Sequence, residues 1–473
     1  MHVAQRVSWL GRLKRRARVR EEASMESGIV GELDAGALIE CLGVGACPIS
    51  KVERVQIRGG WVSAKLVAVS EDGVEHVRTQ KPVRLWVLSD VHTDRPSNFG
   101  WLEKHLVACG DEQYFDVLVC AGDVASRADV FRKTMALFTS RFDAVVLTAG
   151  NHDLWTTGSS KVATSLEKLD EVRATCGALG VRLGPFRIND VLVAPLYSWY
   201  DRAFDAEPDI DAGDTPERRK RWIDYTYCKW GPSLETLEGF HFSSDRGASK
   251  HVAHHFATMN GRRLREMEKH LFENKNLVVI TVSHFAPRPE LLPEKRFLID
   301  PHLPKVSGSK IIETQLRRLR PAAHVFGHTH LAVDSSLDAV RYVNWPLGSD
   351  RERTNQTRVV AGSGALLLYA SDAGFTPVQW TFWSEWYRRV PRDPTNLTLA
   401  PWVENAYKLL GLDLPRGCVT TTNSDEGLAY PGFPDNMRAD DFYRLNAATN
   451  TCYRSTRHGD DLQPNSALAT TTT

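Results

Sequence analysis

The sequence predicts an α/β fold, and three observations carry this prediction. Six short apolar runs, each of the length of a buried strand, are bounded by polar residues or glycine. Stretches with helical spacing separate several of these runs, as in a sheet covered by helices. Residue types that bind metals follow five of the runs directly. The runs are residues 83–88, 117–121, 145–149, 191–194, 277–282 and 322–326.

The helices of this fold are expected between the runs. In the stretch 309–319, Ile311, Ile312, Leu316 and Leu319 recur at helical spacing, which predicts one face packed on a sheet. The expected helices are residues 99–108, 129–142, 161–179, 261–271 and 309–319.

The two ends of the chain differ from this middle part, which we assign to one main domain over residues 81–400. Residues 1–27 open on a basic stretch without acidic residues, which is typical of a solvated tail or of an organelle presequence. Residues 28–80 carry short alternating runs that predict a small β module. Residues 415–473 are rich in Thr, Asn, Asp, Gly and Ser, so we expect a disordered tail.

Composition excludes several classes of function. The 59 Lys and Arg nearly balance the 58 Asp and Glu, so the net charge of +1 makes nucleic acid an improbable partner. No apolar run approaches the roughly 18 residues that a membrane span needs. Eight scattered cysteines without a CxxC pair indicate reduced thiols and therefore an intracellular protein, which we expect in the cytoplasm unless the basic N-terminus directs it to an organelle.

Chemistry-bearing residues gather where the predicted strands end. In α/β sheets, ligands bind in the crevice outside the carboxyl ends of the strands, so these groups are expected to converge on one site. A single Asp or His after a strand is more often a helix cap than a ligand. Helix capping does not explain five such groups that each follow a strand. The groups are Asp90 and His92; Gly122 and Asp123; Gly150, Asn151, His152 and Asp153; His284; and Gly327, His328 and His330.

These motifs resemble those of the calcineurin-like metallophosphoesterase superfamily at every ligand position, over residues 82–350. The resemblance implies a two-sheet β sandwich flanked by helices, with a dinuclear metal site at the carboxyl ends of the strands. The stretch 59–63 is similar to part of an SH3-like repeat, which makes the β module of residues 28–80 a candidate site for a partner protein. The segment 342–348, followed by residues 351–353, is similar to one found in plant and algal members of the superfamily.

The resemblance also implies a set of ligands and a reaction. Carboxylates can bridge two cations, and imidazoles suit Zn, Fe, Mn or similar divalent or transition metal ions. The expected reaction is hydrolysis of a phosphate ester, by in-line attack of a metal-bridging hydroxide on phosphorus. One metal ion would be held by Asp90, His92, Asp123 and His330, and the second by Asp123, Asn151, His284 and His328.

Two further residues are catalytic candidates. By the resemblance, His152 faces the substrate and stabilises the transition state or protonates the leaving oxygen. Asp153 is either a second catalytic group that orients His152 or the cap of a following helix.

Departures from the motifs of known subfamilies reduce the number of possible substrate classes. Protein phosphatases carry Asp-Arg-Gly after the second motif, of which this chain keeps only Arg127 as a candidate phosphate ligand. Their third motif ends in Glu where this chain has Asp153, and the tyrosine of purple acid phosphatases is replaced by Ser126. A phosphodiesterase or phosphomonoesterase is therefore expected. A protein phosphatase, and a scaffold that keeps the fold without turnover, stand as alternatives.

An insertion over about residues 198–260 is the candidate cap. It is rich in aromatic residues, which predict either a lid that selects the leaving group or a subdomain with its own small core. Its aromatic residues include Trp199, Tyr200, Trp222, Tyr225, Tyr227 and Trp230.

Overall fold

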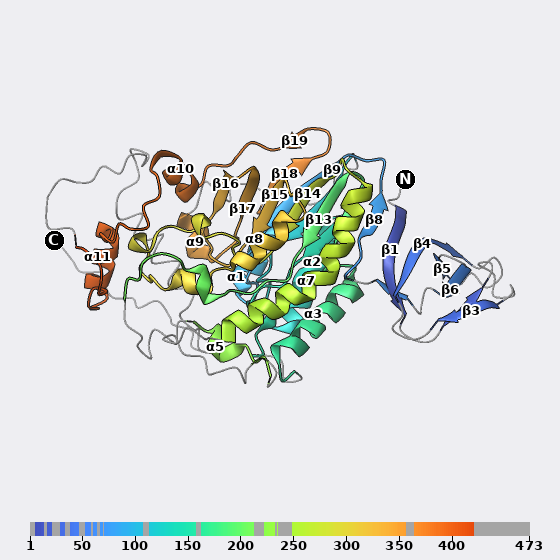
Figure 1. Cartoon of the computed structure of the whole chain (residues 1–473), viewed down its shortest axis with the longest axis horizontal. Coiled ribbons are helices and arrows are strands. Elements are labelled where there is room, and N and C mark those ends of the chain that lie inside the picture. The colour runs from blue at the N-terminus through green and yellow to red at the C-terminus, as the bar shows by residue number, and fades with distance from the viewer. Residues whose placement is uncertain are drawn as a thin grey trace, which may run out of the picture.

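The computed structural model describes most of the main domain, with six gaps, and the N-terminal part as separate strands (Figure 1). The described residues are 71–106, 113–157, 162–211, 222–231, 234, 248–355 and 364–420, together with 5–13, 17–20, 29–33, 38–46, 53–57, 60–63 and 67–69. Nearly all of the predicted tail, from residue 421 to 473, lies outside this set.

Two sheets form the centre of the main domain. In the first, three parallel strands are flanked by an antiparallel pair, in the order β11-β10-β9-β18-β19. These strands are β9 (Val83–Leu88), β10 (Phe115–Cys120), β11 (Ala144–Leu147), β18 (Leu366–Ala370) and β19 (Gly374–Phe375).

The second sheet runs in the order β16-β17-β15-β14-β13-β12-β8, and its four central strands, β13, β14, β15 and β17, are parallel. The strands are β8 (Glu75–Arg78), β12 (Phe186–Ile188), β13 (Val191–Pro195), β14 (Val278–Val282), β15 (Ala323–Phe326), β16 (Val333–Leu337) and β17 (Val340–Asn344).

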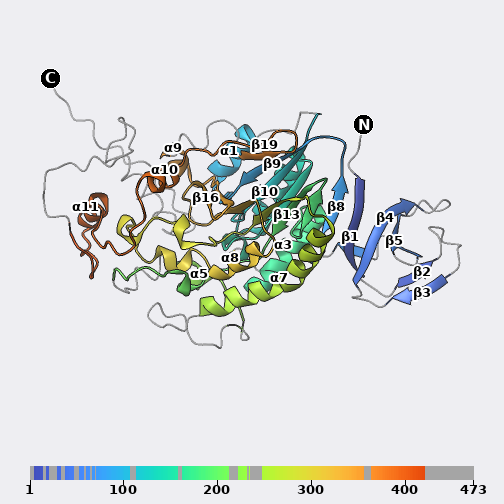
Figure 2. The ribbon, with the colours of Figure 1, turned by 45° about the horizontal axis from the view of Figure 1, so that its top comes forward.

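Helices cover the outer faces of both sheets, so the predicted sandwich flanked by helices is confirmed. Figure 2 shows α1 on one side of the sheets and α7 and α8 on the other. The helices are α1 (Pro96–His105), α2 (Ala128–Arg141), α3 (Ser165–Leu179), α5 (Asp224–Tyr227), α7 (Ala248–Glu273), α8 (Lys310–Arg317), α9 (Asp350–Asn355), α10 (Phe382–Arg389) and α11 (Pro401–Leu409).

The core between the sheets is aliphatic. Strand residues such as Leu85, Val117, Ile280 and Val325 are fully buried there, and each contributes about 1.5–3 kcal/mol by leaving water. Both faces of the central strands are covered, which explains why they appear in the sequence as continuous apolar runs and not as alternating ones.

The N-terminal β module begins earlier than predicted. The residues expected to form a basic tail, 1–27, contain two strands, Gln5–Leu13 and Ala17–Arg20. β1 pairs with β4, β7 and β8, so its ladder joins the module to the second sheet. The module's strands are β1 (Gln5–Leu13), β2 (Ala17–Arg20), β3 (Ile29–Leu33), β4 (Leu38–Ala46), β5 (Glu53–Ile57), β6 (Gly60–Ser63) and β7 (Val67–Val69).

The predicted cap is divided between core and helix. α7 begins at Ala248, inside the predicted cap and 13 residues before the expected start of that helix at Gly261. Several of the cap's aromatic side chains are buried in the core beneath α7 and α8 and do not form a separate one; they are Trp199, Tyr200, Trp222 and Trp230. Within the residues that the structure describes, we find no helix with the length and apolar character of a membrane span.

Candidate metal centre

The seven predicted ligands meet at one edge of the sandwich. Asp90 and Asp123 follow β9 and β10, and Asn151 follows β11 by four residues. From the second sheet, His284 follows β14, and the His328–His330 segment follows β15. The carboxyl ends of parallel strands point the same way, so the two sheets present their ligands to a common space.

The backbone at this edge is held in an uncommon conformation. Among the described residues, nine that are not glycine have a positive φ, and five of these nine are predicted ligands. Each such residue costs about 1–3 kcal/mol, which the rest of the fold must offset. The five are Asp90, His92, Asp123, His328 and His330, with φ between 45° and 71°.

Two glycines permit the close approach of the ligand loops. A Cβ atom on Gly122 would lie 2.6 Å from the backbone nitrogen of Gly150, and φ at Gly122 is +89°. A Cβ atom on Gly150 would lie 2.2 Å from the Oδ1 atom of Asp123. Neither position therefore has room for a side chain.

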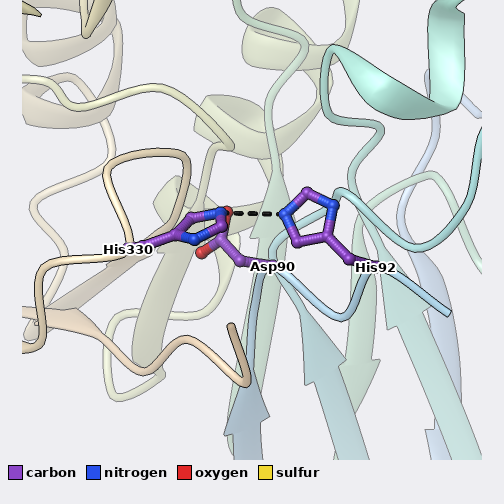
Figure 3. A group of neighbouring side chains, drawn as sticks. All are labelled: Asp90, His92 and His330. Carbon is purple, nitrogen blue, oxygen red and sulfur yellow. Dashed lines mark hydrogen bonds and ion pairs between the residues drawn. The ribbon is translucent and has the colours of Figure 1, made fainter. Parts of the chain in front are cut away.

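The first group of donors consists of Asp90, His92 and His330 (Figure 3). The Nε2 atoms of His92 and His330 lie 2.8 Å apart, and Nε2 of His330 lies 3.7 Å from Oδ1 of Asp90. The other ring nitrogen of His330, Nδ1, lies 3.1 Å from Oε1 of the buried Glu352. A carboxylate accepts hydrogen bonds, so Glu352 places the proton on Nδ1 and leaves the Nε2 lone pair facing the site.

The second group lies around Asp123. Oδ1 of Asp123 lies 3.4 Å from Nε2 of His284, and its Oδ2 lies 3.8 Å from Nε2 of His92. Oδ1 of Asn151 lies 3.0 Å from both Nε2 of His284 and Nδ1 of His328. One oxygen of Asp123 therefore faces each group of donors, which suits a carboxylate that bridges two ions.

The donor atoms suit bound cations. Nδ1 of His284 donates to the backbone oxygen of Ala121 at 2.7 Å, so Nε2 faces the oxygens of Asp123 and Asn151 and is the nitrogen that can bind a metal ion once its proton is lost. Burial alone would lower the pKa of His284, but the charge of Asp123 raises it to about 9. The site thus attracts positive charge, and a divalent metal ion can take the place of the proton.

His152 is the most solvent-exposed of the residues around Asp123. Its side chain is 20% exposed, and its Nε2 atom lies 3.8 Å from Oδ2 of Asp123. The ring stacks on the indole of Trp155 with 3.6 Å between centroids, and burial lowers its pKa to about 4. The ring is therefore neutral at pH 7 and borders the metal ligands on the open side.

Asp153 is fully buried, and backbone amides occupy both of its oxygens. Oδ1 accepts from the amides of Val124 and Ala125, and Oδ2 accepts from those of Asp123 and Gly150, over 2.8–3.1 Å. Burial, followed by the charge of Asp123, raises the pKa of Asp153 to about 7. These bonds join the loops after β10 and β11, and they favour a positioning role for Asp153 over a catalytic one.

Arg127, the candidate phosphate ligand, pairs with a neighbour on its own helix. Its guanidinium contacts the Asp129 carboxylate at 2.8 Å, and the two side chains are 55% and 69% exposed. Arg127 is also the residue that precedes α2, with its backbone amide 3.3 Å from the Asp94 carboxylate.

Two residues that contact the ligands were not foreseen from the sequence. Glu352 on α9 fixes the tautomer of His330, as described above. Asp224 on α5, from the predicted cap, accepts from Nδ2 of Asn151 at 2.8 Å and from Nε1 of Trp155 at 2.7 Å. Asp224 belongs to no recognisable motif, and Glu352 stands in the segment 351–353, whose resemblance to plant and algal members gave it no role.

Comparisons with known proteins identify the family of the main domain. The family model for calcineurin-like phosphoesterases matches residues 83–332. The acyl-carrier-protein phosphodiesterase PptH of Mycobacterium tuberculosis is 31% identical over 128 residues, which cover 25% of this chain and 38% of that protein. The match therefore spans less than half of the length of this curated relative.

A solved structure from the same bacterium, of the phosphopantetheinyl hydrolase PptH, aligns with 60% of this chain and 95% of its own. Over that alignment the sequence identity is 20% and the TM-score is 0.43.

Proposed function

Because this chain belongs to the calcineurin-like phosphoesterases, metal-dependent enzymes that hydrolyse phosphoesters, we propose that it cleaves phosphodiesters at a centre of two metal ions. The observation that supports this best is the meeting of seven donor residues at one place, among them Asp123, whose two oxygens face two separate groups of donors. When bound, two such ions supply Lewis acidity, which acidifies a water molecule and neutralises the charge on phosphoryl oxygens.

The ligands would divide as the two groups of donors do. One ion would be held by Asp90, His92, Asp123 and His330, and the other by Asp123, Asn151, His284 and His328. The set comprises four imidazoles, two carboxylates and one amide oxygen, which suits Mn, Fe or Zn. Glu352 and the backbone oxygen of Ala121 hold His330 and His284 in the tautomers that ligation needs.

His152 is the candidate that acts on the substrate. It lies beside both donor groups, and it is the exposed member of the cluster. Its ring can stabilise charge on the phosphoryl group or donate a proton to the leaving oxygen. The ring is neutral at pH 7 but keeps one N–H, which can donate a hydrogen bond to a phosphoryl oxygen or to the leaving oxygen.

The preference for diesters is supported by the curated relative, whose name describes a phosphodiesterase of an acyl carrier protein. A phosphodiester that joins a carrier protein to its prosthetic group is therefore the first natural substrate to test. Asp224 on α5 accepts a hydrogen bond from Asn151, which places this part of the inserted segment next to the site.

The experiment compares metal content with hydrolysis. Purified protein is analysed for bound metal, stripped with a chelator and reloaded with Mn²⁺, and assayed on p-nitrophenyl phosphate, bis-p-nitrophenyl phosphate and a holo acyl carrier protein. We expect hydrolysis to require metal and the diesters to be cleaved faster than the monoester. A reloaded protein that cleaves none of the three would overturn the proposal.

Two variants and a control locate the activity. Asp123→Asn should lose activity together with bound metal. His152→Ala should keep its metal and lose about 10²–10⁴-fold in kcat, the range of a general acid. His254→Ala, at an exposed position on α7, is the matched control and should resemble the wild type.

A further inference from the structure

The acidic residue Asp224 contacts the candidate site from an unexpected direction. It lies on α5, in the described segment 222–231 of the insertion, 73 positions after Asn151 in the chain. Its side chain is buried, and a single oxygen, Oδ1, accepts both from Nδ2 of Asn151 and from Nε1 of Trp155. Asp224 contacts the amide nitrogen of Asn151 and the indole nitrogen of Trp155, and not the side of Asn151 that faces the donors. A ligand or catalytic role therefore does not explain a carboxylate at this place.

The first contact decides which atom Asn151 offers to the metal centre. The oxygen and nitrogen of an amide have nearly the same shape, so packing alone does not distinguish its two orientations. A carboxylate oxygen 2.8 Å away accepts hydrogen bonds and therefore requires the NH₂ group of Asn151 on its side. The amide oxygen is then turned toward His284 and His328, where a ligand atom is needed. In the reverse orientation, an NH₂ group without a lone pair would face the metal.

The second contact reaches the exposed histidine. Trp155 donates its indole N–H to Asp224, which fixes the plane of the ring. That ring stacks on the imidazole of His152 at an interplanar angle of 29°. The same carboxylate therefore determines the orientation of a metal ligand and of the surface against which His152 rests.

The position of Asp224 is itself well determined. The backbone oxygen of Tyr227 accepts from both the amide and the hydroxyl of Thr156, at 2.9 Å each. The amide of Lys229 donates to the hydroxyl of Ser165. On either side of α5, Trp222 and Trp230 are buried in the main core. α5 is thus held against the loop after β11 by several contacts. A residue that orients a ligand needs such a fixed position of its own.

We propose that Asp224 is a positioning residue through which the inserted segment orients the metal ligand Asn151 and, by way of Trp155, the catalytic candidate His152. This inference rests on the proposed metal centre. It adds a role for the insertion: the segment completes the site from behind and does not only select the leaving group.

The test measures metal affinity apart from activity. Mn²⁺ is titrated by calorimetry into chelator-stripped wild type, Asp224→Ala and Asp224→Asn. Loss of a residue that orients a ligand weakens metal binding by about 10- to 100-fold, and we expect this for Asp224→Ala. Asp224→Asn retains one oxygen that can accept both bonds, so it should restore most of the affinity. An Asp224→Ala protein that binds Mn²⁺ as the wild type does would overturn the inference.

Trp155→Phe removes the contact of Asp224 with Trp155 and leaves its contact with Asn151. This variant also tests the proposal if Asp224→Ala does not fold. The phenyl ring lacks the N–H donor, whereas the bond between Asp224 and Asn151 remains. We expect wild-type Mn²⁺ affinity, a lower kcat on bis-p-nitrophenyl phosphate and an unchanged KM. Unchanged kcat, or a loss of affinity as large as that of Asp224→Ala, would contradict the proposal. A wild type that binds no Mn²⁺ would overturn the metal centre, and this inference with it.

Discussion

Replacing Asp153 by asparagine tests whether this residue positions the ligand loops or takes part in the reaction. Its two carboxylate oxygens each accept two backbone N–H groups, and all four come from the loops after β10 and β11. An asparagine has a single acceptor oxygen, so in either orientation its NH₂ group faces two N–H donors. Two buried donors then stay unpaired at about 1–3 kcal/mol each, which predicts a loss of about 2–6 kcal/mol in the free energy of unfolding.

The assay is urea denaturation in the presence of a chelator, so that metal binding does not contribute to the measured stability. Asp170→Asn is the matched control, because the side chain of Asp170 is 71% exposed and its pair with Arg173 contributes less than about 1 kcal/mol. If Asp153→Asn unfolds within about 0.5 kcal/mol of the wild type but has lost its activity, the residue acts in catalysis and the positioning argument is refuted.

Three further results are expected. Glu352→Gln should weaken Mn²⁺ binding by about 10- to 100-fold, because an amide no longer imposes one tautomer on His330, and calorimetry showing wild-type affinity would contradict this. Gly150→Ala should abolish hydrolysis by displacing Asp123, whereas Gly177→Ala on α3, where a Cβ meets nothing within 4 Å, should stay active and gain about 0.5–1 kcal/mol of stability. Metal present at about 100 times its Kd should stabilise the protein by about 2.7 kcal/mol over the chelated form in thermal unfolding, and equal melting temperatures would count against a metal site.

The order of strands and ligands was predictable from the sequence because both are local properties. A buried strand needs a continuous apolar run, and the turn that follows it carries the ligand in the next few residues, as at Asp90 and His284. Four of the five expected helices were therefore placed within about four residues of their observed bounds. The exception is α7, whose first 13 residues have a mixed sequence that resembles the preceding insertion.

Other features depend on contacts between distant parts of the chain. The aromatic residues of the insertion are equally suited to a lid and to a core, and only packing under α7 and α8 shows that Trp199 and Trp230 are buried. Asp153 was expected to orient His152 as a second catalytic group or to cap a helix, and its four amide partners became visible only once two loops were brought together.

The sequence by itself determined the family resemblance, the fold class and the seven donor residues, since these follow from short motifs at the ends of apolar runs. The tertiary structure alone decided which atoms those donors present. Asp224 and Glu352 orient Asn151 and His330 across separations of 73 and 22 residues, through hydrogen bonds that exist only when the sheets have packed. A motif can specify which residues reach a metal centre, but the direction in which each amide or imidazole points is set by partners that chain order does not place beside them.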